Sequence, residues 1–129
     1  MNEFEQARGV YEYLWKNFDD IIEMHKANVV FNYLFTLLLT DAGHPDVEKL
    51  LRSPYIKQYD KVKQADVFRV FTAVALYYEQ DLDKAEGLLE EGKKLVRYAP
   101  TISEENLEAN LYQYLRKEIV LRKHEKALS

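Results

Sequence analysis

The stretch VVFNYLFTLLL, Val29–Leu39, is the most apolar part of this chain of 129 residues. As an α-helix it would extend about 16 Å, roughly half of the hydrocarbon core of a bilayer. We therefore predict a buried helix and no membrane span. The N-terminal residues include Glu3, Glu5 and Arg8 and lack the apolar core of a signal peptide. These features predict a cytoplasmic location.

The composition around this stretch is that of an ordinary globular protein. Hydrophobic residues make up 47% and charged residues 31%, and the formal net charge is −4. The length fits one helical domain over residues 1–129. The chain has no cysteine, which excludes a disulfide scaffold, a Cys-based zinc site and thiol catalysis. An acidic balance does not favour non-specific nucleic-acid binding.

The spacing of apolar residues predicts an all-α fold. Turn residues are scarce, with four glycines and three prolines, and apolar residues recur every three or four positions. Short connections imply antiparallel neighbours, so we expect a stack of helical hairpins. Ser53 and Pro54 form a typical helix start, a cap followed by proline at the first helical position. The six or seven expected helices cover about 2–24, 27–41, 45–52, 53–59, 63–80, 81–98 and 102–126.

Two of these helices have contrasting patterns. The helix over about 63–80 is apolar nearly all round, which is typical of a central helix, and Phe71 and Val74 should be almost fully buried. The helix over about 81–98 carries one apolar stripe and should be an outer, solvated helix.

The chain also contains a weak internal repeat of about 37 residues. Val30-Phe31-Asn32 matches Val67-Phe68-Arg69, and each of these segments lies in an apolar helix.

One part of the chain is similar to a known repeat. Tyr77, Ala85, Leu89 and Gly92 follow an order of aromatic, small, bulky and small residues across a helix–turn–helix. On these residues the stretch Ala65–Val96 resembles a tetratricopeptide repeat. The turn departs from the family because its usual glycine is missing and it is one residue short. The resemblance implies a stack of repeat-like helical hairpins.

Polar residues inside the two apolar helices are the candidate binding residues. Asn32, Thr36 and Thr40 form one stripe, and Arg69 and Thr72 lie on the matching helix. Such a stripe is able to line a groove in which Asn and Arg hold the backbone or carboxylate of a peptide. In the alternative interpretation, the threonines bond to their own helix, or the polar residues mark where each helix meets solvent.

No motif for catalysis or metal binding is evident. The three histidines, His25, His44 and His124, do not form a His-Glu-x-x-His motif, and the adjacent carboxylate pairs diverge on a helix. No serine lies in a Gly-x-Ser-x-Gly motif, and no glycine-rich phosphate loop occurs. We therefore predict a chain that is not an enzyme, with no cofactor and no metal.

The two ends of the chain differ in charge. Residues 1–20 carry two basic and five acidic groups, whereas residues 116–129 carry five basic and two acidic groups. The last helix continues its apolar stripe, Leu107, Leu111, Leu115 and Ile119, almost to the C-terminus. Its distal part must be covered, either by the apolar stripe of the first helix in the same chain or by a second copy. We predict a homodimer through the terminal helices.

These observations lead to three functional interpretations. The first is a non-enzymatic helical repeat-like module that binds a protein or peptide. The second is a ligand-sensing or dimerising regulatory domain that acts with a DNA-binding partner. The third is an enzyme whose active site is too dispersed to recognise in the sequence.

Overall fold

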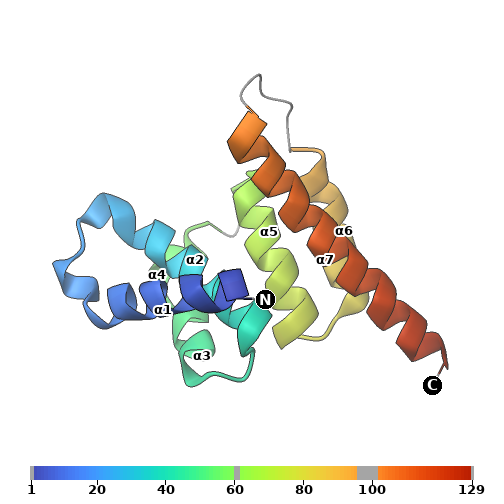
Figure 1. Ribbon diagram of the computed structural model, residues 1–129, viewed down its shortest axis with the longest axis horizontal. Helices are drawn as coiled ribbons and strands as arrows, with labels where there is room; N and C mark the ends of the chain where they lie inside the picture. The colour runs from blue at the N-terminus through green and yellow to red at the C-terminus, as the bar shows by residue number, and fades with distance from the viewer. Residues whose placement is uncertain (1, 60–61, 96–101, 129) are drawn as a thin grey trace. The chain divides into compact units, whose positions relative to one another are not determined.

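The computed structural model describes residues 2–59, 62–95 and 102–128, and the backbone alone for residues 2, 3 and 102–110. This part of the chain is all helical and contains no strand, which confirms the predicted fold class (Figure 1). The described residues form two compact units, an N-terminal unit within 1–61 and a C-terminal unit within 62–129. The single domain over 1–129 stays a prediction.

The N-terminal unit contains four α-helices and one short 3-10 helix. They are α1 (Asn2–Lys16), η1 (Phe18–Asp20), α2 (Glu23–Thr40), α3 (Pro45–Leu51) and α4 (Pro54–Lys57). Helix α2 is central and packs against α1, α3 and α4. Tyr33, Leu34 and Leu37 are completely buried, which confirms the buried helix predicted from the apolar run.

Aromatic rings join α1 and η1 to the rest of this unit. The ring of Phe4 lies 6.3 Å from that of Phe35, and the ring of Trp15 lies 5.1 Å from that of Phe18 and 6.3 Å from that of Tyr33, measured between centroids. At these separations aromatic rings attract one another beyond the area they bury. Phe4 and Trp15 of α1 therefore pack against aromatic residues of α2.

The predicted first helix, residues 2–24, was too long. Helix α1 ends at Lys16, and Ile21 and Ile22 have extended backbone with ψ values of 139° and 135°. The side-chain amide of Asn17 donates to the carbonyl oxygen of Tyr13 at 2.9 Å. This bond occupies a carbonyl at the end of the helix, where backbone acceptors have no partner in the next turn.

The two following helix starts agree with the sequence. Ser53 Oγ accepts a hydrogen bond from the backbone N–H of Tyr55 at 3.1 Å, and Pro54 begins α4. His44 Nδ1 accepts from the backbone N–H of Asp46 at 3.0 Å before Pro45. Side-chain acceptors at these positions satisfy N–H groups that the first turn of a helix leaves unpaired.

The C-terminal unit contains three α-helices and one π-helix. They are α5 (Ala65–Ala73), η2 (Val74–Tyr78), α6 (Leu82–Lys93) and α7 (Ile102–Leu128). Helices α5 and α6 pack against each other, and α7 lies along both of them (Figure 1). On α6, Ala85 and Leu89 are buried while Asp83 and Glu86 are exposed, which confirms the predicted outer helix.

The helix predicted over 63–80 differs in two respects. Its last part is a π-helix, in which the backbone N–H of Glu79 bonds to the carbonyl oxygen of Val74 at 2.9 Å. Val74 is 7% exposed as expected, but Phe71 is only half-buried, so its predicted burial was wrong. The buried side of α5 includes Val67, Val70, Thr72 and Ala73, whereas Phe71 and Phe68, three residues apart on one side of the helix, are both half-buried.

Gly92 is a position where α6 approaches its neighbours closely. A Cβ atom at Gly92 would lie 2.7 Å from the Cβ of Phe68 and would overlap the Tyr112 hydroxyl. That hydroxyl donates a hydrogen bond to the carbonyl oxygen of Ala65. The small residue in the repeat-like pattern is therefore required by packing. Val96, the last residue of the compared stretch, lies outside the described residues.

Candidate protein interface on the last helix

The inner face of α7 forms the core contact of the C-terminal unit. Tyr112, Leu115 and Ile119 are each at most 2% exposed. This confirms the predicted stripe for Leu115 and Ile119, whereas Leu111 is half-buried and the side chain of Leu107 lies outside the described part. Helix α7 is therefore held by a narrow apolar strip.

A tyrosine pair and an arginine flank this strip. Burial raises the pKa of Tyr77 and of Tyr114, and the nearby Glu118 carboxylate raises both further. The guanidinium carbon of Arg122 lies 4.9 Å from the centroid of the Tyr77 ring, a cation–π distance. Both tyrosines remain protonated at neutral pH and act as packing groups.

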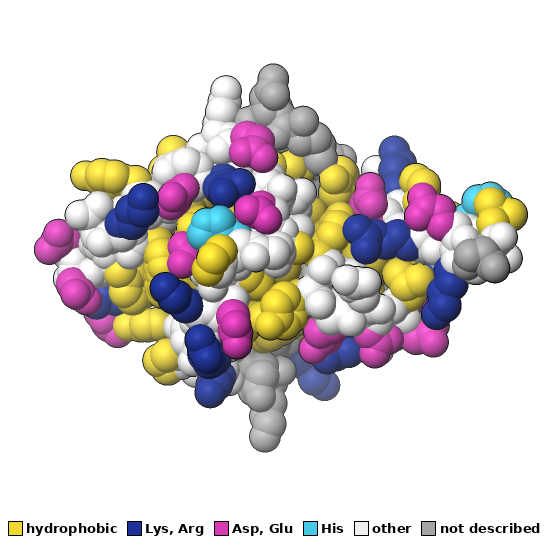
Figure 2. All heavy atoms as spheres, turned by 90° about the horizontal axis from the view of Figure 1, so that it is seen from below, with side chains coloured by type: hydrophobic (Ala, Val, Ile, Leu, Met, Phe, Trp, Pro, Cys, Tyr) yellow, Lys and Arg dark blue, Asp and Glu magenta, His cyan; other side chains and the backbone are white. Residues whose placement is uncertain are grey.

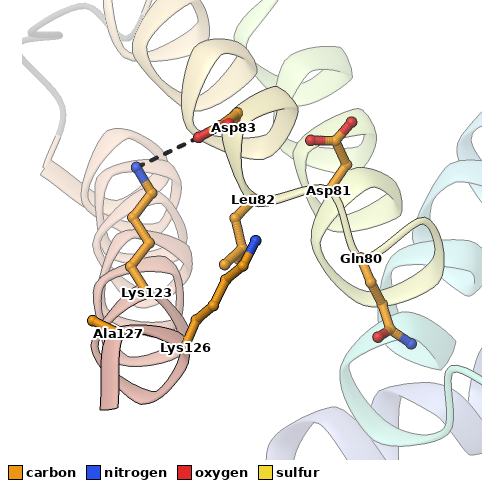
Figure 3. Close-up of a pocket in the computed structure, with 7 residues that line it drawn as sticks. All are labelled: Gln80, Asp81, Leu82, Asp83, Lys123, Lys126 and Ala127. Atoms are coloured by element: carbon orange, nitrogen blue, oxygen red, sulfur yellow. Dashed lines mark ion pairs between the residues drawn. The ribbon is translucent and has the colours of Figure 1, made fainter. Parts of the chain in front are cut away.

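A hollow of about 560 Å³ lies between the start of α6 and the end of α7 (Figure 3). Lys123 Nζ spans it and pairs with Glu86 Oε1 at 2.7 Å and with Asp83 Oδ1 at 4.0 Å. The hydrogen bond to Glu86 raises the pKa of Lys123. The cation of Lys123 therefore joins α7 to α6. The lining residues are Gln80, Asp81, Leu82, Asp83, Lys123, Lys126 and Ala127.

Two residues on the α6 side of this hollow, Gln80 and Asp81, belong to the turn that begins α6. Asp81 Oδ1 accepts from the backbone N–H of Lys84 at 3.1 Å and so caps α6. In Figure 3 the side chains of Gln80 and Asp81 point away from the two lysines. Gln80 has a φ of 55°, the left-handed conformation that normally selects glycine. The short turn noticed in the sequence is thus closed by a strained glutamine.

The opposite side of α7 carries the most distinctive surface of this unit. Val120 is 59% exposed and Leu121 is 53% exposed, although both follow directly after the buried Ile119. They line a second hollow, of about 510 Å³, together with Gln113, Arg116 and Lys117. We call these five residues, with Glu125 and Leu128 on the same side of the helix, the α7 outer face.

The α7 outer face combines apolar side chains with charges of both signs. Leu128 is 75% exposed and extends the apolar part toward the C-terminus. Figure 2 shows hydrophobic side chains interleaved with basic and acidic ones where α7 finishes. An exposed apolar centre with a polar rim is typical of protein interaction sites.

The sequence prediction missed Val120 and Leu121. The signal was present, because Ile119, Val120 and Leu121 are three consecutive apolar residues. Successive helical residues point about 100° apart, so three in a row cannot all lie on one buried stripe.

The predicted binding residues of the N-terminal unit lie on α2. Thr36 is 5% exposed, and its hydroxyl donates to the carbonyl oxygen of Tyr33 at 2.9 Å. Thr40 donates to the carbonyl oxygen of Thr36 at 2.7 Å, and the side-chain amide of Asn32 donates to the backbone carbonyl oxygen of Asn28 at 2.9 Å. All three side chains therefore have partners on their own helix.

The other two predicted binding residues lie on α5 in the C-terminal unit. Thr72 is completely buried and donates to the carbonyl oxygen of Phe68 at 2.6 Å, while Arg69 is 9% exposed. The local bonds of the threonines match the alternative of back-bonding to the helix. A peptide groove lined by Asn32, Thr36, Thr40, Arg69 and Thr72 stays a prediction.

Chemical sites are not evident in the described part of the chain. Within residues 2–59, 62–95 and 102–128, no group of three or more His, Asp or Glu side chains is placed to hold a metal ion. In the same ranges, no helix has both the length and the apolar content needed to cross a bilayer.

Comparisons with known proteins give no relative. No protein-family model, curated protein or solved structure matches this chain. The surfaces of the molecule are therefore the basis for a functional proposal.

Proposed function

We propose that this chain is a non-enzymatic helical module that binds a protein partner through the α7 outer face. The observation that carries the proposal is the exposure of Val120 and Leu121 beside the basic side chains of Arg116 and Lys117. Burying these two apolar side chains supplies affinity, and the surrounding charges supply selectivity.

The chemistry of the neighbouring surfaces supports this choice. Lys123 in the other hollow is engaged by Asp83 and Glu86, so its charge is used to hold α7 in place. On the outer face of the same helix, Arg116 and Lys117 lie on the N-terminal side of Leu121 and Glu125 lies on its C-terminal side. A partner with an apolar stripe and charges opposite in sign to these would complement this face.

Site-specific photo-crosslinking tests the proposal. A photoreactive amino acid at position 121, introduced into the full chain in its native cell, should give discrete crosslinked products. The matched control carries it at Glu90, which is exposed on α6 away from the outer face. Equal crosslinking from both positions, or none from position 121, would contradict the proposed interface.

A ligand-sensing regulatory domain is the second candidate, and the hollow of about 560 Å³ favours it. This volume is in the range of small-molecule sites. Lys126 from α7 lines this hollow beside Lys123 and adds a second positive charge that favours an anionic ligand. A panel of carboxylate and phosphate metabolites should then raise the melting temperature of the wild type but not of Lys126→Ala. Identical shifts in the two proteins would argue against a ligand in this hollow.

A further inference from the structure

The spacing of charges on the α7 outer face makes this surface complementary to itself. Lys117, Leu121 and Glu125 are separated by four residues each and therefore lie along one line on the helix. The rise of an α-helix places the cation and the anion each about 6 Å from the leucine along the axis. A positive charge, an apolar centre and a negative charge follow one another at equal intervals.

We propose that the partner of the α7 outer face is a second copy of this chain, bound with the two α7 helices antiparallel. A two-fold axis through Leu121 brings the two Leu121 side chains together. It also places Lys117 of each copy opposite Glu125 of the other. This inference rests on the proposed function, since it names the occupant of the same surface.

The charges select the antiparallel arrangement over the parallel one. In a parallel pair, Lys117 would face Lys117 and Glu125 would face Glu125, and both contacts would be repulsive. In the antiparallel pair both contacts are attractive, and a symmetric contact of this kind closes on itself. Within the described residues, neither Lys117 nor Glu125 has an ion-pair partner in its own chain, so both charges are available to the second copy.

Self-recognition explains the face better than a purely acidic partner does. An acidic protein would complement Arg116 and Lys117 but would be repelled by Glu125. Leu128 extends the apolar surface, so the contact reaches from Gln113 to Leu128, about 24 Å along the helix. One helix face of this length buries less area than a stable dimer needs, which places the complex among weak, reversible dimers.

Sedimentation velocity of the full chain, over concentrations of about 10 µM to 1 mM, tests this inference. The wild type should shift from monomer to dimer as the concentration rises. Lys117→Glu should raise the dissociation constant about ten-fold, because two attractive contacts become repulsive. Lys57→Glu, which makes the same change in net charge at an exposed position of α4, should leave dimerisation unchanged.

Charge exchange makes the test specific. Glu125→Lys alone should also weaken the dimer, whereas the double variant Lys117→Glu with Glu125→Lys should recover it. Mixing the two single variants should form a heterodimer, since each supplies the charge that the other lacks. Leu121→Asp should abolish association, and its helical circular dichroism reports whether it folds.

Each outcome separates the inference from the function it rests on. A monomer at every concentration overturns self-association, while crosslinks from position 121 to a different protein would still support the proposed interface. A dimer that Lys117→Glu does not weaken, or that the double variant does not restore, places the contact elsewhere and overturns the antiparallel arrangement.

Discussion

The two units of this chain build their cores in different ways. In the N-terminal unit, large aromatic rings fill the space around α2, as the contacts of Phe4 with Phe35 and of Trp15 with Tyr33 show. In the C-terminal unit, small residues such as Ala73, Ala85 and Gly92 let the helices approach closely. An aromatic core should be sensitive to lost volume, whereas a close-packed one should be sensitive to added volume.

The largest effect should come from removing volume at the centre of α2. Leu34 is completely buried, and Leu34→Ala should lower the free energy of unfolding by about 2–5 kcal/mol through lost burial and a residual cavity. Urea denaturation measures the loss. Met24→Ala is the control, because Met24 is 78% exposed and should change stability by less than about 0.5 kcal/mol.

Hydrogen exchange shows whether the two units respond separately to Leu34→Ala. If each unit is an independent cooperative body, amide exchange should accelerate in residues 2–59 and stay unchanged in residues 62–95. Equal acceleration in both ranges would instead support the single domain predicted from the sequence.

Added volume at the close contact of Gly92 should give the next largest effect. Gly92→Ala should destabilise the chain by about 1–3 kcal/mol, because the new methyl group would lie 2.7 Å from Phe68 Cβ. Gly87→Ala on the same helix has no atom within 4 Å and should stabilise by about 0.5–1 kcal/mol through helix propensity. Thermal unfolding of the two variants measures the loss of stability at Gly92 and the gain at Gly87. Stabilisation by Gly92→Ala would refute close packing at that position.

A hydrogen bond at the edge of the aromatic core should contribute less. The hydroxyl of Tyr33 donates to Asp46 Oδ2 at 2.8 Å, so Tyr33→Phe should cost about 1 kcal/mol at neutral pH. Tyr55→Phe removes a similar bond to Glu23 at an exposed site and should cost less. A larger loss for Tyr55→Phe in urea denaturation would contradict this order.

Alkaline pH sharpens the test of Tyr33. Burial raises the pKa of Tyr33, and its hydrogen bond to Asp46 raises it further. Because the folded chain holds this proton more tightly, the stability that protonated Tyr33 contributes is fully present below the pKa of an unfolded tyrosine, about 10. This contribution is lost as the pH rises from about 10 through the higher pKa of the folded state. Tyr33→Phe should therefore lose stability less steeply above about pH 10 than the wild type does.

The smallest effect concerns the turn of the C-terminal unit. Gln80→Gly should stabilise by up to about 1 kcal/mol, because glycine adopts a φ of 55° without strain. Gln64→Gly is the matched control at a φ of −131°, where glycine relieves nothing and should destabilise slightly. A loss of melting temperature in Gln80→Gly would show that the glutamine side chain contributes more than the strain costs.

The sequence by itself determined the features that depend on neighbouring residues along the chain. The three-four spacing of apolar residues predicted an all-α fold, and the run Val29–Leu39 predicted a buried helix. Ser53 and Pro54 predicted the start of α4. Helical periodicity and capping act over one or two turns, so these features are readable without knowledge of the fold.

Tertiary structure alone decided which surface of each helix is covered. Phe71 was predicted at the centre of the core, but it lies with Phe68 on a half-buried side of α5. Val120 and Leu121 look like core residues in the sequence, yet they lie on the outer face of α7. Hydrophobicity identifies residues able to be buried, whereas the shape and size of the neighbouring helices determine which of them are buried.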